Sequence, residues 1–453
     1  MVITKWLSTK ENKDIQRLFW PILIEQTLTV TIGMVSAMMV SGVGAFAVSG
    51  VNLVDTLNAI IIAIFQAIAV GATVIVAQRI GAKNVKDAGE TAYQSITFCV
   101  LLATIFGVTV MITGRHILSF LYGSADENVL EASATYLFYS AISFPFIGLF
   151  AACSGVMRAG GDSRPPMVAS AIANVVNVLL AFLLIRMGFG VQGVSIAMLC
   201  ARVLAGFLAF FYLRKGIRGV ILPGGKLRLT KEVLTPVLRV GVPSGIDTAF
   251  FQVARVLMTV FMSGMGTVAL HANAIGNSVI MFMIIPGSAF SMVSITMVGQ
   301  AYGAQLFYTV RRFMKKFCIC SAVSSAVMFM IVYSLLNPLM SLYSPSPETA
   351  EIARRLILIL GIMTPFLHGL AFCLPQMLRA CGDAKATMYI SVCSLILLRM
   401  FGSWFFGVFM DWGVVGVWMG MFLDWAGRGI SFGIRSFTNA WNGGRKPMDE
   451  VKQ

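Results

Sequence analysis

Long apolar runs are the feature that most limits how this chain can fold. Twelve such runs are separated by polar segments or by segments that contain Pro or Gly. An α-helix rises 1.5 Å per residue, so about 20 residues cross a hydrocarbon core roughly 30 Å thick, and each of the runs is long enough to do so. Strands of a membrane barrel alternate apolar and polar residues, whereas these runs are apolar on all sides. The sequence therefore predicts an all-α integral membrane protein.

The predicted transmembrane helices number twelve, and an even number places both ends of the chain on one side. They cover residues 19–41, 47–77, 92–113, 131–157, 165–187, 192–213, 243–265, 272–299, 315–337, 355–378, 386–409 and 414–437. Counted over alternate loops, the side of the N-terminus holds 26 Lys and Arg residues and the opposite side holds 4. Because cytoplasmic loops are rich in Lys and Arg, we expect a cell-membrane protein with both termini in the cytoplasm.

The composition argues against several other classes of protein. Only 12% of the residues are charged, whereas soluble chains average about 25%. The net charge of +15 is spread over many loops and forms no single basic patch, so nucleic acid is not an expected partner. The eight cysteines lie in or beside apolar runs without a CxxC pair, which is typical of small buried residues rather than of metal ligands. We expect no metal and no cofactor.

An internal repeat divides the chain into two halves. Glu25 and its neighbours match Asp247 and its neighbours, and RAGGDSRPPM at 158–167 matches RACGDAKATM at 379–388 in nearly the same register. Because each half has six helices, both halves start on the same side, and such parallel repeats enclose a central cavity in transporters. The predicted parts are an N-lobe at 1–220, a basic cytoplasmic linker at 221–238 and a C-lobe at 239–453.

Five motifs at corresponding points of the two halves are distinctive in combination. They are VAQRIGAKN (76–84), MRAGGDS (157–163), MSGMGTVALHANAIGN (262–277), VGQAYGAQ (298–305) and LRACGDAK (378–385). Together they resemble the multidrug and toxic compound extrusion (MATE) family over nearly the whole chain. The resemblance implies a secondary antiporter that exports amphipathic organic compounds, often cations, in exchange for H⁺ or Na⁺ by alternating access. The expected partners are a small-molecule substrate and the lipid bilayer, and the expected state is a monomer.

Eight Asp, Glu, Lys and Arg residues lie four or more residues inside the ends of the predicted helices. At the bilayer centre such a residue costs about 2.5 to 3.5 kcal/mol. They must therefore be paired, hydrated or close to a helix end. The four acids are candidates for binding the coupling ion: Glu25, Asp55, Asp247 and Asp424. The four bases are candidates for a cavity wall or a charge network: Arg202, Arg255, Arg399 and Arg428.

Asp424 has two expected partners. Asp424 and Arg428 are four residues apart on one helix and share a face, while Arg399 lies at about the same depth on the antiparallel neighbour. One interpretation is a neutralising network that fixes the packing of the last two helices. The other is that Asp424 responds to a proton or an ion and changes its pairing between the inward-open and outward-open states.

Glu25 and Asp247 each follow a proline by four residues at equivalent positions of the repeat. A proline frees backbone carbonyls, and a carboxylate beside such a break can bind Na⁺ or exchange a proton. The alternative is that the two acids stabilise kinked helix starts at the cytoplasmic side. Asp55 has Asn277 as its repeat equivalent, which indicates either a functional asymmetry between the lobes or a polar packing residue.

The chain departs from the family at two positions. Many members carry Asp-Thr in the first helix, where this chain has Ser36 and Ala37. Some members carry a carboxylate in helix 7, where this chain has Phe251. Coupling through the usual first-helix aspartate is therefore not expected, and the coupling group must be one of the four acids above.

The arginines raise a second possible function. If Arg255 faces a cavity, an anionic or zwitterionic substrate is expected, and the protein is a flippase or exporter of an anionic or lipid-linked compound. If Arg255 snorkels or pairs with Asp247, a cationic substrate remains. Gln252, Asn177 and Ser36 are further cavity candidates, and hydrogen bonding between helices is the alternative for each.

An integral-membrane enzyme is a third possibility. GISFG at 429–433 fits the nucleophile motif GxSxG, but it lies in a predicted transmembrane helix rather than at a strand–turn–helix corner. We therefore expect no catalytic residue and no enzymatic activity.

Overall fold

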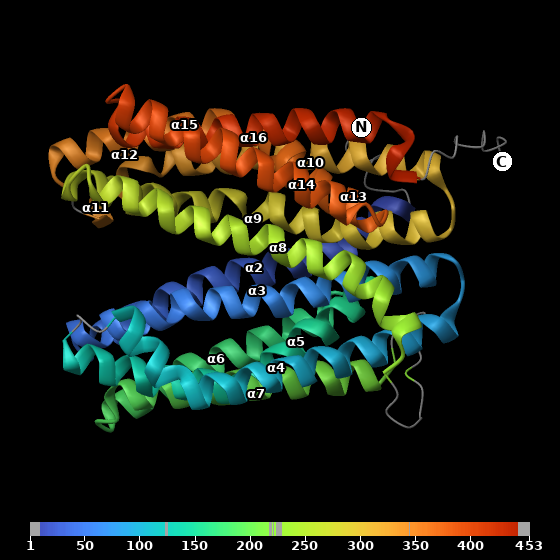
Figure 1. Cartoon of the computed structure of the whole chain (residues 1–453), viewed down its shortest axis with the longest axis horizontal. Coiled ribbons are helices and arrows are strands. Elements are labelled where there is room, and N and C mark those ends of the chain that lie inside the picture. Colours follow the sequence, from blue (N-terminus) through green and yellow to red (C-terminus); the bar gives the residue numbers. More distant parts are fainter. Residues whose placement is uncertain are drawn as a thin grey trace. The chain divides into compact units, whose positions relative to one another are not determined.

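The computed structural model describes residues 10–122, 126–216, 220, 222, 229–343 and 345–442. These residues form long helices joined by short turns (Figure 1), and the predicted all-α class is confirmed. By their packing the residues divide into two compact units, Met1–Gly245 and Ile246–Gln453. We call them unit 1 and unit 2 and describe each by itself.

Unit 1 contains the helices of the first repeat. They are α2 (Lys10–Ser41), α3 (Ala45–Gly81), α4 (Val85–Tyr122), α5 (Glu127–Ala159), α6 (Arg164–Arg186) and α7 (Gly190–Arg214). The next helix, α8 (Lys231–Ser263), begins in unit 1 and ends in unit 2.

Unit 2 contains more and shorter elements. Its further helices are α9 (Thr267–Gly303), α10 (Phe307–Ser334), α11 (Leu336–Tyr343), α12 (Pro347–His368), α13 (Leu374–Ala380), α14 (Ala384–Ser394), α15 (Phe401–Trp404) and α16 (Gly413–Phe437), and the 3₁₀ turn η4 (Asn439–Asn442) follows them. Three π-helical segments continue the shorter helices without a break: η1 (Gly369–Cys373), η2 (Leu395–Met400) and η3 (Phe405–Phe409). Among the described residues of unit 1, no helix contains such a segment.

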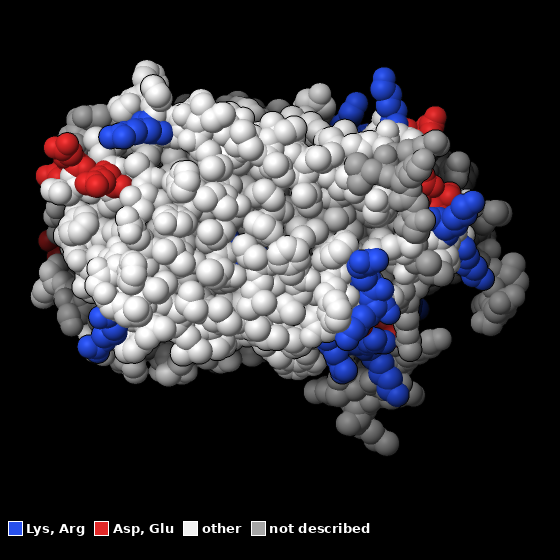
Figure 2. Space-filling model, turned by 90° about the horizontal axis from the view of Figure 1, so that it is seen from below, with Lys and Arg blue, Asp and Glu red and all other residues white. Residues whose placement is uncertain are grey.

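Eleven helical stretches of the described residues are long and apolar enough to cross a membrane. They correspond to the first eleven predicted spans. The twelfth, predicted at 414–437, coincides with α16, a continuous helix whose apolar run contains charged residues at positions 424, 428 and 435. Figure 2 shows a face with a broad band almost free of charged side chains, and Lys and Arg gather mainly at one end of that band.

Several predicted helix ends were wrong because polar residues continue the helices. The span predicted at 92–113 is the middle of α4, whose first turn contains Asp87. Likewise the span predicted at 19–41 starts too late, since α2 begins at Lys10. Hydropathy marks where a chain leaves the hydrocarbon, whereas a helix continues as long as its backbone hydrogen bonds do.

Small residues allow the helices of unit 1 to approach closely. A Cβ added to Gly50 of α3 would come within 3.1 Å of backbone atoms of Val129 and Ser133 on α5. Gly71 of α3 lies against the backbone of Val237, in the first part of α8. This contact explains why α8 begins in unit 1, since membrane helices pack through such small residues.

The predicted lobe limits stay a prediction. Most of residues 217–228, which include the first part of the predicted linker, lie outside the described residues. The remainder of the linker is largely helical, because α8 already begins at Lys231.

Candidate functional site

Two ion pairs occupy equivalent places in the two units. In unit 1, Arg158 of α5 donates from Nη2 to both carboxylate oxygens of Glu25 on α2, at 2.7 and 2.9 Å. In unit 2, Arg379 of α13 donates to the carboxylate of Asp247 on α8. All four side chains are at most 13% exposed. We call Glu25–Arg158 and Asp247–Arg379 the repeat ion pairs.

The acid that follows each of these arginines by four residues makes a second contact. Oδ2 of Asp162 lies 3.7 Å from Nη2 of Arg17. Asp383 accepts two hydrogen bonds from Arg435 of α16, at 2.8 and 3.1 Å. The RAGGD and RACGD motifs therefore supply an arginine to the first helix of each repeat and an aspartate to a second basic residue.

The repeat ion pairs favour a structural role for Glu25 and Asp247. Charge-assisted hydrogen bonds between a guanidinium and a carboxylate are about twice as strong as hydrogen bonds between neutral groups. A proton or Na⁺ would have to displace that guanidinium before it could bind. Of the two interpretations drawn from the sequence, the geometry fits a structural role better than the ion site. The expected helix starts were wrong, because α2 and α8 begin at Lys10 and Lys231 and both acids lie well inside these helices.

Asp55 has a different environment from the other three acids. Its side chain on α3 is exposed, and Oδ1 accepts a hydrogen bond from the Tyr136 hydroxyl on α5 at 3.3 Å. Within the described residues, no ion pair is formed by this carboxylate. Arg202 of α7 is close enough to attract Asp55 electrostatically, but its own hydrogen bond goes to the Ser143 hydroxyl at 2.9 Å. We call Asp55, Tyr136 and Arg202 the Asp55 site.

A row of polar side chains lies beside the Asp55 site. Asn58 donates from Nδ2 to the Ser140 hydroxyl at 3.0 Å, and Ser143 donates to the Ser140 carbonyl at 2.6 Å. Asn58 is buried, and its Oδ1 has no hydrogen-bond partner within the described residues. An accessible carboxylate beside an unsatisfied amide oxygen can accept a proton or contribute oxygen ligands to Na⁺.

Asp424 lies at the centre of a buried charged cluster in unit 2. Its side chain is 0% exposed, and Oδ1 accepts hydrogen bonds from Ser394 at 2.7 Å and from Arg428 at 2.9 Å. Nη1 of Arg399 lies 4.0 Å from the other carboxylate oxygen, Oδ2. We call Asp424, Arg428, Arg399 and Ser394 the Asp424 cluster. The predicted pairing of these charges is confirmed, and its role in coupling stays a prediction.

The ring of Phe251 lies under both arginines of this cluster. The guanidinium carbons of Arg399 and Arg428 are 5.0 and 5.9 Å from its centroid. The ring also meets Phe372 edge-on at 6.4 Å, and Phe372 meets Trp425 at 5.1 Å. Cation–π attraction in a desolvated site is worth about 2 kcal/mol, so Phe251 helps to hold two positive charges with one acid.

Arg255 is exposed and lies one turn beyond Phe251 on α8. It contacts Gln252 at 3.4 Å, and the described residues give it no ion pair. The expected alternative, in which Arg255 pairs with Asp247, was wrong because Asp247 binds Arg379 of another helix.

Ser36 and Asn177 are half-buried on α2 and α6. The described residues include no hydrogen bond that joins either of them to the Asp55 site or to the Asp424 cluster. Ser36 and Asn177 thus lie outside both groups, as do the repeat ion pairs and the Arg255–Gln252 contact.

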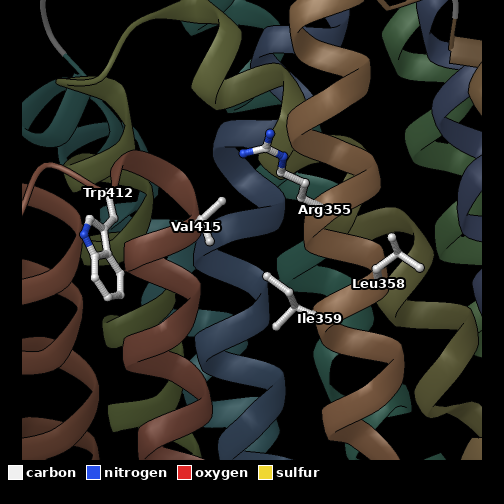
Figure 3. A pocket seen from close by; sticks show the side chains of 5 residues that line it. All are labelled: Arg355, Leu358, Ile359, Trp412 and Val415. Carbon is white, nitrogen blue, oxygen red and sulfur yellow. The ribbon is translucent and has the colours of Figure 1, made fainter.

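A separate pocket of about 500 Å³ lies between α12 and α16. Figure 3 shows Arg355, Leu358 and Ile359 on α12, Val415 on α16 and Trp412 immediately before α16. Arg355 is already paired with Glu351 at 2.5 Å. The pocket contains none of the candidate residues.

Comparison with protein families explains the repeat. The MatE family model matches residues 21–183 and again residues 243–405, two ranges of equal length. The chain belongs to the MATE family. The two matches begin at Pro21 and Pro243, which are equivalent positions of the repeat found in the sequence, so each half of this MATE protein is one family unit.

Individual relatives agree with this assignment. The chain is 26% identical over 433 residues to the uncharacterized transporter YisQ of Bacillus subtilis, and the match covers 94% of each chain. It is 25% identical to the probable multidrug resistance protein NorM of Thermotoga maritima, over 90% of this chain and 88% of that one. An outward-facing multidrug resistance MATE transporter has the same fold, with a TM-score of 0.84, 19% identity and 96% of both chains covered. The protein is therefore a multi-pass membrane transporter of the MATE family.

The sequence analysis did not predict Arg158 and Arg379, which form the repeat ion pairs of this MATE protein, one in each half. Both fall outside the predicted spans and were therefore assigned to loops, although each lies in the last turn of a helix. The signal was present, because both repeats have an acid after the proline and an arginine in the RAGGD or RACGD motif at matching positions. Two matched opposite charges on different helices indicate an ion pair.

Proposed function

We propose that this MATE-family transporter is a secondary antiporter that exports amphipathic organic compounds in exchange for H⁺ or Na⁺. It alternates access between the two sides of the cell membrane and keeps both termini in the cytoplasm, as the Lys and Arg bias of the loops indicates. It acts as a monomer on a small-molecule substrate, without a cofactor other than the coupling ion and without catalytic residues.

The observation that carries the coupling part of the proposal is the contrast among the four acids. Glu25, Asp247 and Asp424 each accept a hydrogen bond from an arginine. Asp55 is exposed and has a neutral hydroxyl as its partner. Since no guanidinium has to leave before a proton or Na⁺ arrives, Asp55 is the acid best suited to exchange the coupling ion.

The coupling itself is a difference in affinity. An ion bound at Asp55 shifts the equilibrium between two conformations only if it binds one of them more tightly. Arg202 supplies a source of that difference, because it attracts the ionised carboxylate and loses this attraction when Asp55 is neutralised. Movement of α3 or α7 relative to α5 would change this balance.

The test uses purified protein in proteoliposomes with an imposed pH gradient or an imposed Na⁺ gradient. Uptake of two probes is measured, the cation ethidium and the anion 2-naphthalenesulfonate. The wild type is expected to accumulate at least one probe under one of the gradients. Asp55→Asn is expected to reduce gradient-driven uptake by about tenfold or more, within the range of coupling free energies.

The matched control is Glu131→Gln, which removes an exposed carboxylate from α5 without touching the Asp55 site. It is expected to transport like the wild type. If Asp55→Asn also transports like the wild type, the coupling assignment is wrong. If neither gradient drives either probe in the wild type, the antiport proposal itself fails.

A further inference from the structure

The two units differ in how well their intramembrane charges balance. In unit 1, once Glu25 is neutralised by Arg158, the remaining ionisable candidates are Asp55 and Arg202. In unit 2, once Asp247 is neutralised by Arg379, one acid faces three arginines. Those three are Arg255, Arg399 and Arg428. Unit 2 therefore carries two positive charges without a counter-charge among the candidates.

One of these arginines, Arg399, is buried and has hydrogen-bond donors without a partner among the described residues. Arg399 is 5% exposed, and its Nε and Nη1 have no hydrogen-bond partner within the described residues. Arg428 and Arg255 both repel it electrostatically, and Asp424 attracts it. A buried guanidinium with free donors and like-charged neighbours is costly unless an anion or water approaches it.

Arg255 carries one of the positive charges without a counter-charge among the candidates, and its side chain is exposed. It lies eight residues before the end of α8, which is about 12 Å along a helix long enough to cross the membrane. Its exposed side chain has only Gln252 as a partner within the described residues. Arginines at such depth face protein or a water-filled cavity rather than lipid tails.

Helix geometry connects these groups. Phe251 and Arg255 are four residues apart on α8, so they share a face. The ring of Phe251 in turn lies under the guanidinium groups of Arg399 and Arg428. One helix face thus presents a guanidinium, the amide of Gln252 and an aromatic ring that is backed by two further positive charges.

We infer that this face binds the anionic head of an amphipathic substrate. Arg255 and Gln252 donate hydrogen bonds to a carboxylate, sulfonate or phosphate group, and the apolar body of the ligand packs beside Phe251. Arg399 and Arg428 add long-range attraction from the protein interior. The inference rests on the proposed transport function and specifies its substrate class, in contrast to the cations expected from the family resemblance.

The test measures equilibrium binding without any ion gradient, so it does not depend on coupling. Protein in phosphatidylcholine nanodiscs is dialysed against 2-naphthalenesulfonate or against 2-naphthyltrimethylammonium, which share a ring system and differ in charge. Binding to empty nanodiscs is subtracted. The wild type is expected to bind the sulfonate about tenfold or more tightly than the ammonium compound, because hydrogen bonds between charged groups are the stronger kind.

Variants locate the site. Arg255→Gln is expected to weaken sulfonate binding about tenfold, Arg255→Lys to restore part of it, and Arg255→Glu to reverse the preference toward the ammonium compound. Arg186→Gln is the matched control, because Arg186 lies at the end of α6 in unit 1 and outside this face. The control is expected to bind both probes like the wild type.

Two further arms identify the source of the anion. Replacing phosphatidylcholine with phosphatidylglycerol is expected to suppress sulfonate binding if a lipid head group occupies the face, and to leave it unchanged if the ligand is a free solute. Inorganic phosphate at the same ionic strength tests whether the apolar body is needed. Suppressed binding and unchanged binding in phosphatidylglycerol both support an anion site, and they differ only in whether a lipid head group or a free solute occupies it.

The inference is overturned if the wild type prefers the ammonium compound, if it binds neither probe, or if Arg255→Gln binds the sulfonate as well as the wild type does. Such results would leave the proposed antiport function standing, because that function is tested by gradient-driven uptake. Conversely, strong sulfonate binding without gradient-driven uptake would support the anion site and contradict the antiporter.

Discussion

Units 1 and 2 are built on one repeat but use their buried charges differently. Both keep the repeat ion pair between the first helix and the RAGGD or RACGD motif. The other ionisable candidates are particular to one unit. When GVQGVSIAM at 190–198 is aligned with GVVGVWMGM at 413–421, Asp424 and Arg428 correspond to Ala201 and Ala205.

The reverse correspondence holds for unit 1. In the register that pairs Glu25 with Asp247, Asp55 corresponds to Asn277. In the alignment that pairs Ala201 with Asp424, Arg202 corresponds to Trp425. Each shared pair joins the last turn of one helix to the middle of another, whereas the charges found in only one unit lie within the helices. The repeat ion pairs therefore belong to the fold that both units share, whereas the Asp55 site and the Asp424 cluster are particular to one unit each.

The largest expected effect comes from the Asp424 cluster, which unit 1 lacks. Asp424→Asn leaves Arg428 and Arg399 without their acid in a buried site, and should lower the free energy of unfolding by about 3 to 5 kcal/mol. Reversible denaturation in mixed micelles, followed by circular dichroism, measures this loss. The double variant Asp424→Asn with Arg428→Gln should lose less than the single one, because the uncompensated charge is reduced. An equal or greater loss in the double variant would contradict a charge-pairing role.

The second prediction concerns the feature that both units share. Arg158→Gln and Arg379→Gln each remove one partner of a repeat ion pair and should each cost about 1.5 to 3 kcal/mol in the same denaturation experiment. The two losses should be similar, because the side chains are buried to a similar degree. A loss confined to one variant would show that the repeat ion pairs are not equivalent.

The smallest expected effect is one of packing. Gly420 of α16 touches the backbone of Ser403 and leaves no room for a Cβ, whereas the corresponding residue of unit 1 is Ala197. Gly420→Ala should cost about 1 to 3 kcal/mol through overpacking. Ala197→Gly, the exchange in the opposite direction, should cost about 0.5 to 1 kcal/mol through chain entropy alone. Thermal melting of both variants checks the order, and a more harmful Ala197→Gly would reverse the comparison.

The sequence predicted the fold well because the signals that define it are local. An apolar run long enough to cross a membrane forms a helix whatever its neighbours are, so the spans were found and only their ends shifted. The Asp424 cluster was also predictable, since Asp424 and Arg428 are one turn apart on a single helix. Contacts fixed by one helix or by two consecutive helices can be read from spacing.

The remaining contacts depend on packing between helices distant in sequence. Asp247 was considered with Arg255 on its own helix, but its partner Arg379 comes from α13. Likewise the exposure of Asp55 depends on how α3 and α5 pack and not on its spacing from other charges. Spacing along one helix does not contain this information, whereas the internal repeat does, because the repeat pairs the same two positions in both halves.

The π-helical segments of unit 2 give the Asp424 cluster a mechanical property that the charges of unit 1 do not share. A π turn holds one residue more than an α turn. Arg399 lies in η2, and Ser394 is the last residue of the α-helix before it. If the extra residue moved from one end of η2 to the other, Arg399 would turn by about 100° around the helix axis while both ends of the helix stayed in place. Arg399, the arginine nearest Oδ2 of Asp424, thus lies in a π-helical segment with one residue more per turn than an α-helix. A shift of that extra residue along η2 would reorient the Arg399 side chain without displacing the ends of the helix.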